Sequence, residues 1–311
     1  MTGQTTESPH KWSLGIDTSN YTTSLALYDG NEVVQHKRPL PVKPGELGLR
    51  QSDALFHHTV ALPQLLRELL QGQDIAAIGV SDKPRDVPGS YMPCFLAGVS
   101  VAQGIASALG LPLRKFSHQQ GHLAAALYSC EQMALLHDRF LAFHVSGGTT
   151  ELLLVRPGLQ AEILGSTADL NAGQLVDRVG GMLGLDFPAG AALDKLAQSG
   201  RLPRKLSVNT QGLTCHLSGL ENQCRQLHER NARPEDIARY CLEAIAENVV
   251  QLAARAFELH GNLPLMMSGG VCCSGVLRAR VLGDYPEACF AAPEYSADNA
   301  AGIAVLAREG I

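Results

Sequence analysis

Long apolar runs are missing from this chain of 311 residues. No stretch approaches the roughly 20 consecutive apolar residues that a bilayer-spanning helix needs, so we expect neither a transmembrane segment nor a membrane partner. Residues 1–10 are polar and lack the apolar core of a signal peptide. The sequence therefore predicts a cytoplasmic protein.

An excess of basic residues is also missing. Lys and Arg number 25 against 30 Asp and Glu, which gives a net charge of −5. This balance argues against a self-sufficient nucleic-acid-binding protein with a strongly basic face. Contact with a nucleic acid would need a partner protein or a local patch, for example Arg201, Arg204 and Lys205.

The 8 cysteines show neither CxxC spacing nor the regular spacing of a disulfide framework. We therefore expect reduced and mostly buried thiols. The adjacent Cys272 and Cys273 are interpreted as small packing residues, with a redox-active pair as the alternative.

Two histidines four residues apart, His118 and His122, form the most informative short pattern. Ser117 followed by Gln120 is a capping-box spacing, which predicts that a helix begins here and places both imidazoles on one face of its first turns. The glutamate of an HExxH motif is absent. The pattern alone fits a metal site or two partly exposed histidines.

A strand, a polar turn and a returning strand occur twice along the chain. Residues 14–28 form the first such hairpin, and residues 140–155, with the turn Ser146 to Thr149, form the second. Gly147 and Gly148 would let a ligand approach the backbone closely. The repetition predicts two lobes of similar design.

The rest of the chain alternates apolar strands and amphipathic helices, which is typical of an α/β protein. We predict further strands at residues 76–80, 112–116 and 263–267, and a covering loop at residues 39–51. Helices are expected at residues 53–70, 95–109, 169–183, 234–260 and 300–307, with one through Leu193 and one containing Leu277 and Arg278.

Taken in order, these motifs resemble the TsaD family, the catalytic subunits that form threonylcarbamoyladenosine in tRNA, once classed as O-sialoglycoprotein endopeptidases (peptidase M22). The resemblance covers residues 14 to about 307. It rests on LGIDTS at 14–19, HQQGH at 118–122, VSGG at 145–148, Ala172-Gly173 with Asp177, LGLDFP at 183–188, SGL at 218–220, SGGV at 268–271 with Leu277-Arg278, and Asp298-Asn299.

The resemblance implies a fold: two actin-like (ASKHA) lobes, each with a mixed sheet, around a nucleotide cleft. We expect an N-terminal lobe at residues 1–136, completed by the C-terminal helix 296–311. The nucleotide-binding lobe would span residues 137–295.

The resemblance also implies site residues. One divalent metal, Fe²⁺ or Zn²⁺, would be held by His118, His122 and Asp298. An adenine nucleotide, either threonylcarbamoyl-AMP or ATP, would contact nine residues: Ser146, Gly147, Gly148, Thr149, Asp169, Gly181, Asp186, Gly269 and Gly270.

Several positions depart from the family pattern. The acidic pair that follows the first strand, in a Ser-Cys-Asp-Glu-Thr pattern, is absent, because Ser19 is followed here by Asn20, Tyr21, Thr22 and Thr23. A histidine, an acid, a lysine and an asparagine of the pattern are replaced, respectively, by Thr149, Gln174, Glu221 and Ser274. The chain therefore resembles a diverged paralogue, and no residue is identified as the general base.

The implied activity is transfer of a threonylcarbamoyl group from threonylcarbamoyl-AMP to the N6 amine of the adenosine beside the tRNA anticodon. The implied partners are tRNA and TsaB-like or other synthase subunits. Two alternatives remain. One is a non-catalytic paralogue that binds nucleotide or metal and that regulates or scaffolds a true synthase by dimerising through its N-terminal lobe; the other is an actin-like small-molecule kinase or ATPase.

Overall fold

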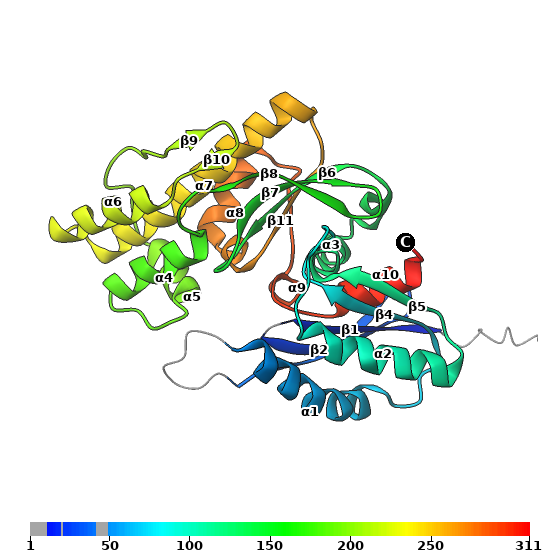
Figure 1. Cartoon of the computed structure of the whole chain (residues 1–311). Coiled ribbons are helices and arrows are strands. Elements are labelled where there is room, and N and C mark those ends of the chain that lie inside the picture. The colour runs from blue at the N-terminus through cyan, green and yellow to red at the C-terminus, as the bar shows by residue number, and fades with distance from the viewer. Residues whose placement is uncertain (1–10, 20, 42–48) are drawn as a thin grey trace, which may run out of the picture. The chain divides into compact units, whose positions relative to one another are not determined.

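The computed structural model describes residues 11–19, 21–41 and 49–311 (Figure 1). Residues 1–10, Asn20 and part of the predicted loop at 39–51 lie outside these ranges. The chain divides into two compact units: the described residues up to Tyr128 together with Asp298–Ile311, and Ser129–Ala297. The sequence-based expectation had been a division at 136–137 and 295–296.

The N-terminal unit contains a five-stranded sheet with the order β3-β2-β1-β4-β5. Its strands are β1 (Trp12–Ser19), β2 (Thr22–Tyr28), β3 (Val33–Pro39), β4 (Ile75–Lys83) and β5 (Leu113–Ser117). β1 pairs antiparallel with β2 and parallel with β4, and β4 pairs parallel with β5. The predicted hairpin at residues 14–28 is confirmed. Strand β3, which carries His36, Lys37 and Arg38, was not predicted.

Helices pack on both faces of this sheet. The helices of the unit are α1 (Gln51–Leu69), α2 (Phe95–Leu109), α3 (His118–Ser129, ending at the boundary between the units) and α10 (Ala301–Glu309). Leu14 and Ile16 of β1 share an apolar core with Leu62 of α1 and Ala102 of α2. Because side chains alternate along a strand, Gly15 and Asp17 point to the opposite face, where α10 lies.

The second unit repeats this topology within a larger sheet of order β12-β11-β6-β7-β8-β10-β9. The strands are β6 (Phe140–Val145), β7 (Thr150–Arg156), β8 (Gln160–Thr167), β9 (Thr210–Gln211), β10 (Thr214–Cys215), β11 (Leu265–Ser268) and β12 (Cys289–Phe290). β6 pairs antiparallel with β7 and parallel with β11, as β1 pairs with β2 and β4. The run β8-β7-β6-β11-β12 thus repeats the order β3-β2-β1-β4-β5 of the first sheet.

Helices surround the second sheet. They are α4 (Ala172–Met182), α5 (Gly190–Ala197), α6 (Ser218–Glu229), α7 (Pro234–His260), α8 (Gly275–Asp284) and α9 (Pro293–Ser296), with 3-10 turns at Met133–His137 and Gly270–Cys273. α7 begins with Pro at its first turn and stops at Gly261, as predicted. Its buried side chains form most of the helical part of the core. Helix α6 was not predicted.

Helix α10 returns the C-terminus to the N-terminal unit by packing directly on backbone. A Cβ on Gly15 of β1 would lie 2.5 Å from the carbonyl oxygen of Ala300. A Cβ on Gly302 would overlap the carbonyl oxygen of Gly121 in α3 and lie 2.6 Å from the amide nitrogen of Ala125. Only glycine fits at such distances, so α10 and α3 cross in backbone contact.

Within the described ranges, none of the helices combines the length and the apolar character that crossing a bilayer requires.

Replacing Gly302 by alanine should destabilise the N-terminal unit by about 3 kcal/mol, because the added methyl group cannot be accommodated without separating α10 from α3. The free energy of unfolding in urea measures this change. Gly104 in α2 provides the matched control, since a Cβ there meets nothing within 4 Å. Gly104→Ala should be neutral or stabilise by up to about 1 kcal/mol. Equal effects of the two substitutions would contradict the packing described.

Candidate functional site

The histidine pair lies on the first turns of α3, as predicted. The amide of Ser117 donates to Oε1 of Gln120 at 2.8 Å, and the amide of Gln120 donates to Oγ of Ser117 at 3.2 Å, so the capping box is confirmed. Nε2 of His118 lies 3.0 Å from Nε2 of His122. Two ring nitrogens therefore face one point beside the helix.

Asp298 reaches the same point from the segment that precedes α10. Its Oδ1 lies 3.5 Å from Nε2 of His118 and 3.5 Å from Nε2 of His122. The next residue, Asn299, contacts the start of α10: its Oδ1 accepts the amide of Ala301 at 3.0 Å. The three ligand-type atoms lie within 4.8 Å of one another.

A second carboxylate, Asp17, holds His118 from behind. Asp17 is fully buried at the end of β1, and its Oδ2 lies 2.7 Å from Nδ1 of His118. The same oxygen accepts the hydroxyl of Ser81 at 2.6 Å, while Oδ1 accepts the amide of Ser19 at 2.9 Å. With Nδ1–H donated to Asp17, the neutral ring presents its lone pair at Nε2, towards His122 and Asp298.

Asp17 was not assigned a role from the sequence, although it stood in the quoted LGIDTS motif. The available signal was a carboxylate at the end of an otherwise apolar strand, because such a group requires a buried partner. The partner, His118, is 101 residues away, and local pattern does not identify it.

Within the triad of His118, His122 and Asp298, the pKa values of His118 and Asp298 are both shifted from their ordinary values. Burial opposes protonation of His118, but the carboxylates of Asp17 and Asp298 overcome this effect and raise its pKa to about 10. Burial likewise opposes ionisation of Asp298, yet hydrogen bonds from His118 and His122 hold its pKa below the usual range. The two carboxylates thus favour positive charge at this point, and a cation placed between the Nε2 atoms would supply it.

The donor set fits a divalent metal. Two imidazole nitrogens and one carboxylate oxygen suit Zn²⁺ or Fe²⁺, and three protein ligands leave positions for a substrate oxygen. The hydrogen bond from Nδ1 of His118 to Asp17 is the outer support that metal-binding histidines usually have. The triad is therefore a possible His/Asp metal site.

A second feature, in the other unit, is a pocket of about 600 Å³ between α4, α5 and the 3-10 turn that follows β11. Its size suits a nucleotide or a drug-sized molecule. Polar groups at the pocket include Asp177 of α4, Asp194 of α5 and Ser274 at the start of α8. Oδ1 of Asp194 accepts the Ser274 hydroxyl at 2.5 Å, and Oδ1 of Asp177 accepts the amide of Ala189 at 2.8 Å.

Some of the residues predicted to bind nucleotide lie at this pocket. Gly147 and Gly270 line it. Ser146, Gly148 and Thr149 belong to the same β6–β7 turn as Gly147, in which Oγ of Ser146 accepts the amide of Thr149 at 3.1 Å. Gly269 precedes Gly270 and has a φ of 95°, with its Cα packed against the backbone of Val145.

Other predicted residues lie elsewhere. Asp169 caps α6: its Oδ1 accepts the amide of Leu217 at 2.9 Å, and its Oδ2 accepts the Ser218 hydroxyl at 2.5 Å. It lines a separate polar pocket of about 230 Å³. Gly181 and Asp186 are exposed and do not line the 600 Å³ pocket. Asp194 was missed, because an acid on a short helix carries no distinctive sequence signal.

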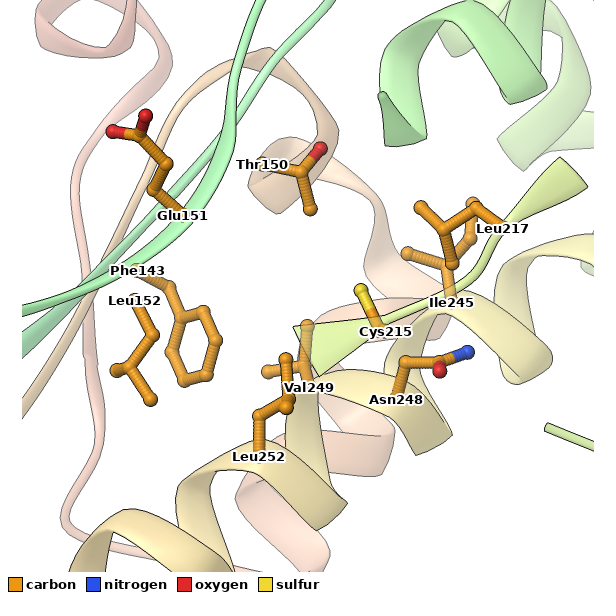
Figure 2. A pocket seen from close by; sticks show the side chains of 10 residues that line it. All are labelled: Phe143, Thr150, Glu151, Leu152, Cys215, Leu217, Ile245, Asn248, Val249 and Leu252. Atoms are coloured by element: carbon orange, nitrogen blue, oxygen red, sulfur yellow. The ribbon is translucent and has the colours of Figure 1, made fainter. Parts of the chain in front are cut away.

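A third cavity lies between the second sheet and α7, lined by Phe143, Leu152, Val249 and Leu252 among others (Figure 2). Its volume of about 10 Å³ admits roughly one water molecule. The buried Oδ1 of Asn248 faces it and has no hydrogen-bond partner among the described residues. This cavity is too small for a substrate.

Similar solved structures identify the fold. The chain aligns over 96% of its length with 98% of component A of the (R)-2-hydroxyglutaryl-CoA dehydratase of Acidaminococcus fermentans, with TM-score 0.58 and 16% identity. It aligns over 98% of its length with 48% of HypF from T. kodakarensis, with TM-score 0.62 and 14% identity. A ROK family glucokinase from Streptomyces griseus gives TM-score 0.54 at 12% identity, covering 96% of this chain and 100% of that one. The predicted actin-like (ASKHA) fold is confirmed.

Sequence comparison is more specific. The chain is 27% identical over 285 residues to a tRNA N6-adenosine threonylcarbamoyltransferase of Methanopyrus kandleri, covering 89% of this chain and 80% of that protein. Residues 42–305 match the family described as TsaD, tRNA N6-adenosine threonylcarbamoyltransferase. With the duplicated actin-like topology and this match over most of its length, the chain belongs to the TsaD family.

Proposed function

We propose that this protein transfers the threonylcarbamoyl group of threonylcarbamoyl-AMP to the N6 amine of the adenosine beside the tRNA anticodon, and that the transfer depends on one divalent metal. The observation that carries this proposal is the convergence of His118, His122 and Asp298, with Asp17 holding His118 in the required tautomer. An actin-like kinase would have no use for this cluster.

The residues of the triad have separate tasks in this proposal. His118 and His122 offer Nε2 lone pairs, and Asp298 adds the carboxylate that balances the charge of the ion. When bound, the metal would polarise the carbamoyl carbonyl and orient the threonyl carboxylate. Asp17 fixes the ring of His118, so the ligand geometry does not have to be organised during the reaction.

The pocket between α4 and α5 is the proposed site of the adenylate. Gly147 and Gly270 offer backbone without side chains, which permits close approach of a ribose or phosphate. The carboxylates of Asp177 and Asp194 are acceptors suited to ribose hydroxyls. We assign Asp169 to the structure of α6 and not to the nucleotide, because it caps that helix and lines the separate pocket of about 230 Å³, not the pocket of about 600 Å³.

Positions that depart from the family pattern have structural partners here. Glu221 pairs with Arg178 at 2.9 Å and with Arg225 at 2.8 Å. Gln174 forms a capping box with Asn171 at the start of α4. No described residue at the triad is assigned as a base for the attacking amine.

A specific observation favours a second candidate, a non-catalytic paralogue that pairs through the N-terminal unit. Phe56 and Val60 of α1 are 64% and 50% exposed, and Leu96 and Leu109 of α2 are 47% and 60% exposed. Apolar side chains on adjacent helices are typical of an interface. Binding of a TsaB-like subunit or of a second copy at this surface is compatible with either candidate.

Recognition of tRNA is proposed to need help from a partner. Of the three basic residues noted in the sequence, Arg204 packs 4.9 Å from the ring centroid of Tyr240 and donates to Gln223. Arg201 and Lys205 are exposed and remain available for phosphate contacts.

Replacing Asp169 by asparagine should lower the stability of the second unit by about 1 kcal/mol at pH 7, because a helix cap is lost. Burial opposes ionisation of Asp169, but bonds from Ser218, Leu217 and Leu170 lower its pKa. The stabilisation is therefore complete above the unfolded pKa of about 3.9 and is lost as pH falls through the lower folded value. Urea unfolding should show the difference from wild type shrinking below about pH 4.

Asp169→Asn also tests whether Asp169 binds the nucleotide or only caps α6. Asp169→Asn should bind AMP with wild-type affinity in calorimetry, whereas Asp194→Asn should bind it roughly tenfold more weakly because a charged acceptor is lost. Asp138→Asn, at an exposed acid of the same unit that does not line the pocket, is the control. A loss of AMP affinity in Asp169→Asn alone would return that residue to the nucleotide site.

Transfer itself is tested by nucleoside mass spectrometry of unmodified tRNA incubated with the protein, Fe²⁺ or Zn²⁺ and freshly made threonylcarbamoyl-AMP, with and without the other synthase subunits. We expect threonylcarbamoyladenosine to form. His118→Ala should lower the initial rate at least about 100-fold, because carbonyl polarisation contributes several kcal/mol. His137→Ala, at an exposed histidine of the other unit, should keep the wild-type rate.

Full activity of His118→Ala would refute the metal assignment. Absence of product under all conditions, with AMP binding intact and the chain dimeric by light scattering, would select the non-catalytic paralogue. Loss of that dimer in Phe56→Ser would place its interface on α1.

A further inference from the structure

Two cysteines that the proposed function does not use lie side by side near the ends of the second unit. Cys130 follows Ser129, the first residue of the unit, and Cys289 opens strand β12, where it pairs with Met266 of β11. The amide of Ala292 donates to Oγ of Ser129 at 3.2 Å. The segments 129–130 and 289–292 are therefore neighbours, although 159 positions separate the two cysteines in the sequence.

The two thiols contact each other and are accessible. Their side chains are hydrogen-bonded, and both cysteines are partly exposed. A second pair, Cys224 and Cys241, is also hydrogen-bonded, but both of its members are fully buried in the core between α6 and α7. The chain thus holds an accessible thiol pair and an inaccessible one.

Arg278 completes the environment of the accessible pair. Its guanidinium lies 4.9 Å from the ring centroid of Phe290, the residue after Cys289. The hydrogen bond from Cys289 and the nearby Arg278 charge lower the pKa of Cys130 against the opposing effect of burial. Cys289 has its pKa raised, chiefly by the same hydrogen bond. Cys130 is thus the thiol that ionises more readily and reacts first, and Cys289 is the resolving thiol, as in redox-sensing pairs.

We propose that Cys130 and Cys289 form a reversible disulfide when the protein meets a peroxide. The Cys130 thiolate attacks one oxygen of the peroxide, which becomes sulfenic acid on sulfur while the other oxygen leaves as water. The Cys289 sulfur then attacks the sulfenic sulfur, the S–S bond forms, and the second oxygen leaves as water. Both thiols are oxidised, one peroxide is reduced to two waters, and a thiol reductant restores the pair.

The position of the bond gives it a structural consequence. It would join the first residues of the second unit to a strand near the unit's end, and so enclose most of that unit in one covalent loop. The chain passes from one unit to the other at 128–129 and at 297–298, so one end of the bond lies two residues from a crossing. Oxidation should therefore stabilise the second unit against unfolding.

The test uses the full chain, reduced and then treated with excess hydrogen peroxide. Intact-mass spectrometry should show a loss of about 2 Da, and non-reducing peptide mapping should find Cys130 joined to Cys289. The Tm of the oxidised protein should be higher by roughly 5 °C or more and should return to its original value with dithiothreitol.

Three variants control the result. Cys130→Ser should show no loss of mass, and Cys289→Ser should instead gain about 16 Da at Cys130 and react with a sulfenic-acid probe. Cys224→Ser, in the buried pair, should oxidise like wild type. A disulfide in Cys130→Ser, a bond between other cysteines, or wild-type thiols that stay reduced in excess peroxide would each overturn the proposal. Circular dichroism verifies that every variant is folded.

Discussion

The contact on which the candidate metal site depends is the backbone crossing of α10 over α3. Gly302 lies against the carbonyl oxygen of Gly121, the residue directly before His122. Gly15 lets the same helix lie directly on β1, and Oγ of Ser24 accepts the amide of Ala300 at 2.8 Å to fix its start. Because these contacts leave no space for a side chain, the segment before α10 is held at the histidines. Asp298 therefore meets residues about 180 positions earlier in the chain.

The buried carboxylate of Asp17 then fixes the orientation of His118. Asp17 alone would be costly at the end of an apolar strand, but Ser81, the Ser19 amide and His118 occupy its oxygens. The imidazole is thereby fixed in orientation and tautomer. Against the opposing effect of burial, the carboxylates of Asp17 and Asp298 raise the pKa of His118, and the same negative charge favours a cation beside its ring. The contacts of Asp17 with Ser81, Ser19 and His118 thus satisfy a buried carboxylate and also orient a proposed metal ligand.

The ends of several helices and the presence of two similar units were predicted from the sequence. Local signals predicted the helix starts and stops, such as the Ser117 capping box and the Pro234-to-Gly261 span of α7, because capping depends on residues within one turn. The repeated hairpins predicted two similar units, and the sheet orders agree. Strand β3 was missed because its exposed edge carries polar residues, and Asp17 and Asp194 were missed because their partners are distant in sequence. Asp169 was predicted at the nucleotide, but its position beside Ser218 is set by tertiary packing.

The most direct measurement is an X-ray absorption spectrum at the zinc edge of the zinc-loaded protein, compared with the spectrum of Asp298→Ala. We expect a shell of nitrogen and oxygen atoms that includes two imidazoles, with one oxygen ligand fewer in the variant. Sulfur in the shell, or a spectrum unchanged by Asp298→Ala, would contradict the assignment of the metal to His118, His122 and Asp298.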